Sequence, residues 1–324
     1  MNHPVAGTDG GIVVVGSLNA DLTIYCERLP LPGETVHGNG FAVNPGGKSA
    51  NQAVAASLLG GNVRLIGAVG KDSNGEMLLA STRRAGVDVS GVLTSTTEAT
   101  GVAVIAVDAA GENNIIISAG ANGSLSPADI AAAGETFTGA SVVCLCLEVK
   151  PETVVAAAQA GHDAGARVLL NLSPYAEIPE ELAALADVLL VNAHEAALFL
   201  GADSSAMPDD DASTHDWDAV RRRFDERGMH RVLVTLGANG SVVLDSHADG
   251  GMVTRIAPTH VTPVDTTGAG DAFTGAVAAR LAGGETLADA ALFASVAAAL
   301  ATTKKGTQAA YPSVADVAKC LRGQ

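Results

Sequence analysis

Short apolar runs alternate along this chain with alanine-rich segments of helical spacing. Residues 48–59, 152–164 and 193–200 place apolar side chains at helical intervals and predict helices. The apolar runs between such segments are short and rich in Val, Leu and Ile, and they predict buried strands at residues 12–15, 63–69, 141–147, 167–171, 188–191 and 232–235. Strands that alternate with helices favour an α/β fold with a mostly parallel sheet that is covered on both faces.

Two stretches break this alternation. Residues 22–43 and 101–118 are richer in β-branched and turn residues and lack a helical period, so they predict antiparallel strands outside the main sheet. An insertion near the carboxyl ends of parallel strands is well placed to cover a ligand as a small β-sheet lid. We therefore expect one domain over residues 11–321, with the lid as part of it and residues 1–10 as a flexible N-terminus.

The composition limits the kinds of partner that the chain is expected to bind. Of its 324 residues, 48% are hydrophobic and 3% are aromatic, so the core is expected to consist of Ala, Val, Leu and Ile. The net charge of −16 argues against nucleic acid or an anionic membrane as a partner, because both repel an acidic protein. No apolar run is long enough to span a bilayer and no signal-like segment opens the chain, which favours a cytoplasmic protein.

The four cysteines have no metal-ligand spacing. Cys144 and Cys146 alternate within an apolar run, so both side chains are expected on one face of a buried strand. Free, buried thiols are typical of a reducing compartment, which again favours the cytoplasm.

The segment D-T-T-G-A-G-D-A-F at residues 265–273 carries the most specific chemistry. Gly268, Ala269 and Gly270 precede an apolar alanine-rich segment, which places them at the start of a helix, and the two glycines allow a ligand to approach the backbone. The unpaired N–H groups of a helix N-terminus suit a phosphate. Asp271 in the first turn suits removal of a proton from a hydroxyl that attacks the phosphate. The alternative is a glycine-rich strand-to-helix turn with a solvated aspartate.

A second glycine-rich element, N-P-G-G-K-S-A-N, spans residues 44–51. Residues 42–49 read A-x-x-x-x-G-K-S, a relaxed P-loop pattern in which Ala replaces the first Gly. In a P-loop, Lys48 would bind phosphate and Ser49 would bind magnesium. The context argues against this alternative, because a P-loop follows the first core strand directly and here a lid-like segment intervenes.

Both elements resemble signatures of one enzyme family. D-T-T-G-A-G-D-A-F-T-G at residues 265–275 resembles the C-terminal signature of the ribokinase (PfkB) family of sugar and nucleoside kinases. G-G-K-S-A-N-Q-A at residues 46–53 resembles the N-terminal signature, with Ser49 in place of the usual Gly. The resemblance covers residues 12–311 and implies a ribokinase-like three-layer α/β/α sandwich with a small β-sheet lid. It also implies a general base at Asp271 and an anion hole at Gly268, Ala269 and Gly270.

The resemblance assigns a set of polar residues to the sugar. Asn19 and Asp21 stand two residues apart after the first strand, so they project the same way and can hold neighbouring hydroxyls; an Asx turn is the alternative. Glu148 follows a predicted strand at the edge where α/β sheets bind ligands, or is a solvated strand end. The implied sugar set is Asn19, Asp21, Gly47, Lys48, Asn51, Glu148 and Asp271.

The resemblance places ATP on the other side of the general base. Asn192 and Glu195 also have the spacing of a helix capping box, and Asn239-Gly240 is a strong hairpin signal, so structural interpretations exist for both segments. Ser295 stands where the family often has a histidine against the adenine. The implied nucleotide set is Asn192, Glu195, Thr235, Gly237, Gly240, Gly270 and Ser295, with Glu195 acting on Mg²⁺ through water.

A monovalent cation, potassium in this family, is implied between two segments near the C-terminus. Ala310 stands where the family usually has a serine, whose hydroxyl is therefore missing here. By position, the implied cation residues are Asp265, Thr267, Ala301, Lys304, Gly306 and Ala310.

The resemblance implies phosphoryl transfer from MgATP to the 5-hydroxyl of D-ribose, by a homodimer that pairs through the lid. One alternative is another acceptor, such as 2-deoxyribose, a ketohexose or adenosine, although few aromatic residues are available for a base pocket. Another is a sugar-binding regulator without activity, against which an intact Asp271 argues.

Overall fold

A nine-stranded sheet forms the centre of the molecule in this computed structural model, which describes residues 10–201, 216–248 and 250–323. The predicted flexible N-terminus, residues 1–10, lies outside this range except for its last residue. Seven strands run parallel, and β12 and β13 add an antiparallel edge. In spatial order the strands are β13 (Met252–Ile256), β12 (Ser241–Asp245), β11 (Arg231–Thr235), β10 (Val188–Asn192), β9 (Arg167–Asn171), β8 (Ala140–Leu145), β1 (Gly11–Val15), β4 (Asn62–Gly70) and β5 (Asp88–Ser95).

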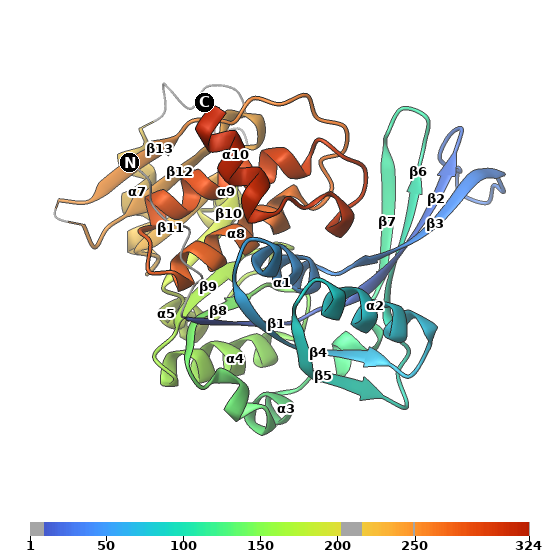
Figure 1. Cartoon of the computed structure of the whole chain (residues 1–324), viewed down its shortest axis with the longest axis horizontal. Coiled ribbons are helices and arrows are strands. Elements are labelled where there is room, and N and C mark those ends of the chain that lie inside the picture. Colours follow the sequence, from blue (N-terminus) through green and yellow to red (C-terminus); the bar gives the residue numbers. More distant parts are fainter. Residues whose placement is uncertain (1–9, 202–215, 249, 324) are drawn as a thin grey trace.

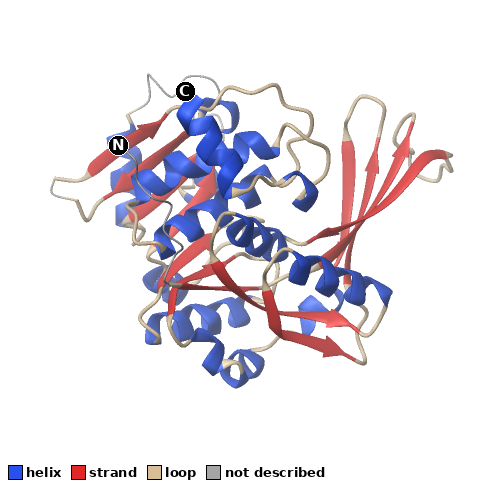
Figure 2. Cartoon of the chain, viewed as in Figure 1, coloured by secondary structure: helices blue, strands red, loops and turns tan. Residues whose placement is uncertain are grey.

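Helices cover both faces of this sheet, so the fold is the predicted three-layer α/β/α sandwich (Figure 2). Alternate residues of β1 enter two separate cores: Ile12 and Val14 enter one, whereas Val13 and Val15 enter the other. The first core includes α1 (Lys48–Leu58), α2 (Ser73–Arg84), α8 (Ala269–Ala282), α9 (Leu287–Ala301) and α10 (Val314–Gly323). The second includes α3 (Pro127–Ala132), α4 (Pro151–Asp163), α5 (Glu180–Leu185), α6 (Ala193–Phe199) and α7 (Trp217–Glu226).

A second, four-stranded sheet projects from the sandwich and is seen at the right of Figure 1. Its strands are, in spatial order, β3 (Gly38–Gly46), β2 (Asn19–Cys26), β6 (Gly101–Val107) and β7 (Asn113–Ser118). The expectation of purely antiparallel strands was wrong for β2 and β6, which pair in parallel. Both strands follow strands of the parallel main sheet, β1 and β5, so the chain leaves the same edge twice in the same direction.

Several elements, among them α2 and β5, were not predicted. Helix α2 buries only Gly75, Leu78 and Thr82, so its sequence has little apolar period. Strand β5 lies at the edge of the main sheet and is mostly accessible, so it lacks the continuous apolar run of the central strands.

Helices α1 and α8 lie unusually close together. A Cβ on Gly275 of α8 would lie 2.5 Å from the carbonyl oxygen of Gln52 and 2.7 Å from the Cβ of Ala55, both on α1. Only glycine fits such an approach, because any side chain would collide with the partner backbone. The contact brings the start of α1 against the start of α8, where the two glycine-rich motifs lie.

None of the helices within the described ranges is both long and apolar enough to cross a bilayer.

Candidate active site

Helix α8 begins after Gly268, whose backbone conformation sets the geometry of the helix N-terminus. Gly268 takes the left-handed conformation, with φ of 75°, and its carbonyl oxygen accepts a hydrogen bond of 3.2 Å from the Tyr311 hydroxyl. The amide of Ala269 is already bonded to the carbonyl of Thr266, at 3.2 Å. The first N–H groups of a helix have no partner within it, so the amides of Gly270 and Asp271 are the donors best placed for an anion.

Both carboxylate oxygens of Asp271 are held by amides from α1. Asn51 Nδ2 donates to Oδ2 at 3.0 Å, and Gln52 Nε2 donates to Oδ1 at 3.0 Å. Burial raises the pKa of Asp271, although the charge of Lys48 and the two amide hydrogen bonds oppose this rise. The structure therefore does not support a freely solvated aspartate: Asp271 is buried, oriented and more basic than usual.

Asn19 and Asp21 begin β2, the strand that leads into the small sheet, rather than ending β1. Asn19 Oδ1 accepts a bond of 2.8 Å from Asn122, whose amide also bonds both backbone groups of Leu18. Burial, and then the charges of Glu148 and Asp271, raise the pKa of Asp21 to about 7. Asp21 is thus part of a crowded carboxylate cluster and not of an Asx turn.

Glu148 is anchored from the other side of this cluster. Its Oε2 accepts bonds from the Ser17 hydroxyl at 2.5 Å and from the backbone amide of Lys48 at 3.0 Å. Burial lowers the pKa of Lys48, but the charges of Asp271 and Glu148 outweigh burial, so its pKa is raised. Lys48 therefore stays cationic beside the carboxylates.

The N-terminus of α1 lies directly against the start of β2. Gly47 caps the helix with φ of 90°, and a Cβ there would lie 2.7 Å from the backbone nitrogen of Asn19. The predicted sugar residues Asn19, Asp21, Gly47, Lys48, Asn51, Glu148 and Asp271 are joined into one cluster by this contact and by the bonds above.

Ser49, the departure from the family signature, points away from this cluster. Its hydroxyl is fully buried, bonds the Val15 carbonyl at 3.4 Å and lies 3.1 Å from the sulfur of Cys146. Cys144 also contacts α1, through Gln52. The prediction that the two cysteines share one face is confirmed, and the serine adds no bulk to the polar cluster.

The P-loop alternative is wrong. Residues 42–46 belong to β3 of the small sheet, and α1 begins at Lys48, so no phosphate-cradling loop lies between a strand of the main sheet and this helix.

A cavity of about 420 Å³ lies on the other side of the α8 N-terminus. Its wall is mainly apolar and includes Phe273 and the α9 residues Ala298 and Ala299. Five of the seven residues predicted for the nucleotide line it: Thr235, Gly237, Gly240, Gly270 and Ser295.

Asn192 and Glu195 do not line this cavity. They form the capping box of α6, with Asn192 Oδ1 accepting from the Glu195 amide at 2.8 Å and Glu195 Oε2 accepting from the Asn192 amide at 2.9 Å. The alternative interpretation of Asn192 and Glu195 as a helix capping box is therefore confirmed. Glu195 is nevertheless close enough for its charge to act on Lys48, so a second role stays a prediction.

The two segments predicted for the monovalent cation lie together. Asp265 accepts bonds of 3.0 Å from the amides of Thr267 and Gly306, and the amides of Val264 and Asp265 both donate to the Thr302 carbonyl. Ala310 is buried and offers no hydroxyl, and Lys304 is exposed. Within residues 10–201, 216–248 and 250–323, no group of three His, Cys, Asp or Glu is arranged to hold a metal.

Comparison with known proteins identifies the family. The pfkB family of carbohydrate kinases matches residues 10–314. The chain belongs to this family.

Members of the pfkB family resemble the chain over almost its full length. A ribokinase of Schizosaccharomyces pombe is 34% identical over 313 residues, which cover 94% of this chain and 96% of that protein. A deoxyribokinase of Salmonella typhi is also 34% identical, over 305 residues that cover 94% and 96%. The structure of an Arabidopsis thaliana ribokinase complexed with ribose and ATP matches with a TM-score of 0.86 and 31% identity, over 97% of this chain and 99% of that one.

The sequence did not indicate several residues that organise this pfkB-family site. Gln52 lies inside a motif that the sequence shows. Its hydrogen bond to Asp271, which is far along the chain, could not be inferred from that motif. Asn122 and Gln308 contact Asn19 and Asn51 through long-range bonds that no local pattern announces. Ser17 and Tyr311 complete the group of unpredicted residues.

We expect Asp21→Asn to raise the melting temperature of the sugar-free protein at pH 8, and to raise it less at pH 5. The Asp21 pKa is about 7 when folded and about 4 when unfolded, so ionisation is penalised only in the folded state. This penalty grows as pH rises through that window and is complete above about pH 7. Calorimetry at both pH values measures the effect.

The matched control is Asp163→Asn, which removes the same charge from an exposed position. An Asp21→Asn gain that is equal at both pH values, or absent, would contradict the assigned burial of this carboxyl.

Proposed function

We propose that this chain is an ATP-dependent ribokinase, which transfers a phosphoryl group to O5 of D-ribose and yields D-ribose 5-phosphate and ADP. One observation carries the proposal: Asp271 is bonded to the polar cluster on one side, while its neighbour Gly270 lines the nucleotide-sized cavity on the other. An acceptor hydroxyl and a phosphate donor can therefore meet at this residue. The ribokinases among the relatives support this choice of sugar.

In the proposed reaction, Asp271 takes the proton of the 5-hydroxyl as the oxygen attacks the γ-phosphorus. The new P–O bond forms while the bond to the β–γ bridging oxygen breaks, and ADP leaves with that electron pair. The amides of Gly270 and Asp271 face the charge that develops on the transferred group. A raised Asp271 pKa suits this role because it makes the carboxylate a stronger base.

The remaining sugar residues position the acceptor. Neighbouring hydroxyls need paired donors and acceptors, since a buried hydroxyl without a partner is costly. Asn19, Asp21 and Glu148 supply acceptors, whereas Lys48 and Asn51 supply donors. We assign the small sheet as a lid over this cluster, because β2 carries two of these residues and continues directly into it. Residues 11–321 would then act as one catalytic domain.

We assign Mg²⁺ and a monovalent cation as cofactors. When bound with ATP, Mg²⁺ neutralises phosphate charge; Glu195 is the carboxylate of the α6 N-terminus that would hold its water ligands. Asp265 and the carbonyls of Thr267, Ala301, Lys304 and Gly306 are oxygen donors that suit a hard cation such as potassium, with Ala310 adding none. Comparing turnover in potassium with that in a large organic cation tests this assignment, since equal rates would contradict it.

Cys26, Cys144 and Cys146 are buried free thiols, as is usual in a reducing compartment. We accordingly propose the cytoplasm as the location, which fractionation of source cells tests.

A second acceptor, 2-deoxy-D-ribose, is supported by the Salmonella typhi deoxyribokinase, whose identity equals that of the Schizosaccharomyces pombe ribokinase. Overall identity therefore does not separate the two sugars. The 2-hydroxyl decides between them, because a site built to bond a hydroxyl rejects an analogue that lacks it.

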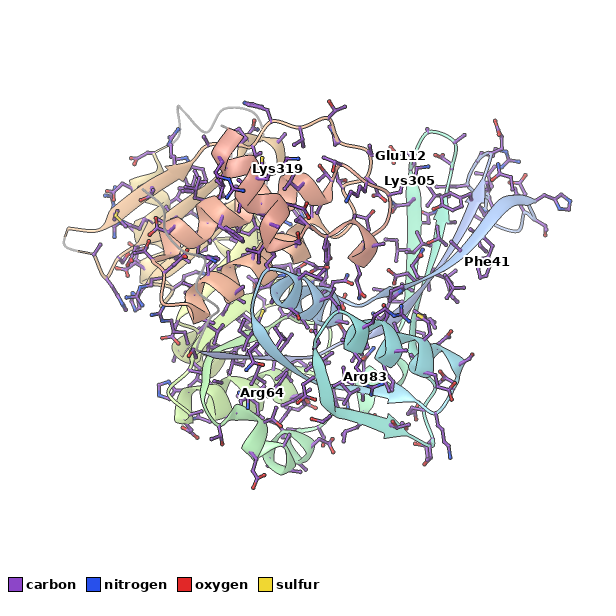
Figure 3. All side chains as sticks on the ribbon, viewed as in Figure 1. Phe41, Arg64, Arg83, Glu112, Lys305 and Lys319 are labelled. Carbon is purple, nitrogen blue, oxygen red and sulfur yellow. The ribbon has the colours of Figure 1, made fainter. Side chains whose placement is uncertain are left out.

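The lid also suggests a partner. Strand β7 is exposed along its whole length, and Ile116 on it and Phe41 on β3 are 72% and 65% exposed (Phe41 is labelled in Figure 3). Exposed apolar strands at both edges of a small sheet favour pairing with another chain. We propose a homodimer formed through the two lids.

The acceptor is tested by coupled ADP release with MgATP and potassium, using D-ribose, 2-deoxyribose, fructose, tagatose and adenosine. We expect kcat/KM for ribose to exceed that of each other acceptor by at least about tenfold, which is about the net contribution of one hydrogen bond. A maximum with 2-deoxyribose would keep the mechanism and replace the sugar, and no ADP release with any acceptor would favour a binding protein.

Asp271→Asn is expected to lower kcat by about 10²- to 10⁴-fold, the usual contribution of a general base, because the amide cannot accept the proton. Sugar affinity, measured by calorimetry without nucleotide, should largely survive. Turnover close to that of the unaltered enzyme would overturn the assignment of Asp271.

Ile116→Lys is expected to convert a dimer into a monomer, as measured by light scattering, because it places a charge on the apolar lid surface. Leu292→Lys is the control, since Leu292 is also an exposed apolar residue but lies on α9, away from the lid. A monomeric unaltered protein at micromolar concentration would exclude the dimer.

A further inference from the structure

Gln52 is a fully buried glutamine whose side chain, among the residues that the structure describes, is bonded to Asp271 and Cys144. It lies on α1, next to Asn51, with no exposed surface. Its Nε2 donates to Asp271 Oδ1 at 3.0 Å, and its Oε1 accepts from the thiol of Cys144 on β8 at 3.4 Å. A side chain so enclosed cannot contact a substrate, so its role must be exerted through Asp271.

Chemistry fixes which end of the Gln52 amide faces Asp271. A carboxylate only accepts hydrogen bonds, so it must face the NH₂ group. Burial raises the pKa of the Cys144 thiol, which therefore stays protonated and donates to the amide oxygen. Both partners select the same orientation, and the amide cannot turn without losing both bonds.

Asn51 holds the other carboxylate oxygen of Asp271, but unlike Gln52 it has a further partner and some exposed surface. Its Oδ1 accepts a bond of 3.0 Å from Gln308, and it retains slight exposure toward the polar cluster. In the proposed function Asn51 also binds the sugar, so its donors are shared between base and substrate. Gln52 has no such second duty and can hold Asp271 in every state of the reaction.

We propose that Gln52 is a positioning residue for phosphoryl transfer, which fixes the plane of the Asp271 carboxylate without touching sugar or nucleotide. This inference rests on the proposed function, since it gives Asp271 the role of base. A base acts efficiently only when its lone pair is aligned with the proton that it removes, and small misplacements cost large factors in rate.

The environment of Asp271 also gives the direction of a pH effect. The Lys48 ammonium and the two amides favour its charged form, whereas nearby negative charge opposes it. Loss of the Gln52 bond should therefore move the acidic limb of the kcat–pH profile to higher pH. The titratable groups that face Asp271 are Lys48 of α1, Asp21 of β2, Cys144 and Cys146 of β8 and the turn after it, Glu148 beyond that strand, and Tyr311 near the C-terminus.

The test is Gln52→Met, which keeps the length and approximate volume of the side chain and removes the donor. We expect kcat with the best acceptor sugar to fall about 10- to 100-fold, with sugar KM within about threefold, because the binding surface is untouched. The apparent pKa of the acidic limb of the kcat–pH profile should increase by about one unit, since the carboxylate loses a charge-assisted bond.

Two controls separate this inference from the proposed function. Gln159→Met alters an exposed glutamine on α4 and should leave kinetics unchanged. Asp271→Asn reports the base itself: normal turnover there would overturn the proposed function. Normal turnover in Gln52→Met beside an inactive Asp271→Asn would overturn only the role of Gln52.

A fall in kcat together with lost sugar affinity and a lower melting temperature would also overturn the inference, because it would indicate general damage to the site. If the Met variant does not fold, Gln52→Glu supplies the test with a polar side chain of the same size. Its carboxyl would share a proton with Asp271, so the acidic limb should move to higher pH again, and an unchanged pH profile would refute the role.

Discussion

The approach of α1 to α8 is the constraint on which the rest of the site depends. Gly275 leaves no side chain between the helices, so the backbones meet at Gln52 and Ala55. The two helix starts consequently lie near each other, and the amides of Asn51 and Gln52 reach the carboxylate of Asp271 with ordinary hydrogen-bond lengths. A wider spacing, set by even one methyl group, would separate the two motifs that the proposed reaction needs in contact. Close packing thus determines chemistry here, because helices filled with alanine and glycine transmit small changes in spacing directly to their termini.

Charge crowding is the second constraint. Asp21, Glu148 and Asp271 lie near one another, with Lys48 beside Glu148 and Asp271, and burial raises the pKa of both aspartates. Such a cluster costs stability in the empty protein, since like charges in a poorly solvated place repel one another. It suits a site whose ligand presents many hydroxyl donors and one hydroxyl that must lose its proton. The same carboxylates that weaken the empty fold are those that a polyol can satisfy, which is a common compromise at functional sites.

Much of this arrangement could be predicted from the sequence. Apolar runs located β1, β8, β9, β10 and β11 because those strands are buried on both faces, and two motifs located the site because each is continuous in the chain. The parts that were missed depend on distant partners. Asn122 lies 103 residues from Asn19, and Gln308 lies 257 residues from Asn51, so no local period or spacing could reveal them. Strand β5 and helix α2 were missed because they bury one face only weakly. The parallel pairing of β2 with β6 follows from where both strands leave the main sheet, which is a property of the whole topology.

The registers of the small sheet have a mechanical consequence. Asn19 pairs with both Gly46 and Gly101, and Val102 pairs with Ser118, so all four strands are rooted along a single line. In a sheet fastened in this way, a displacement of the free end would rotate the strands about these roots. Those roots are the residues that hold Asn19 in place and lead into Gly47 and α1. A load on the outer tips of the sheet would therefore act on the polar cluster that contains Asn19 and Gly47.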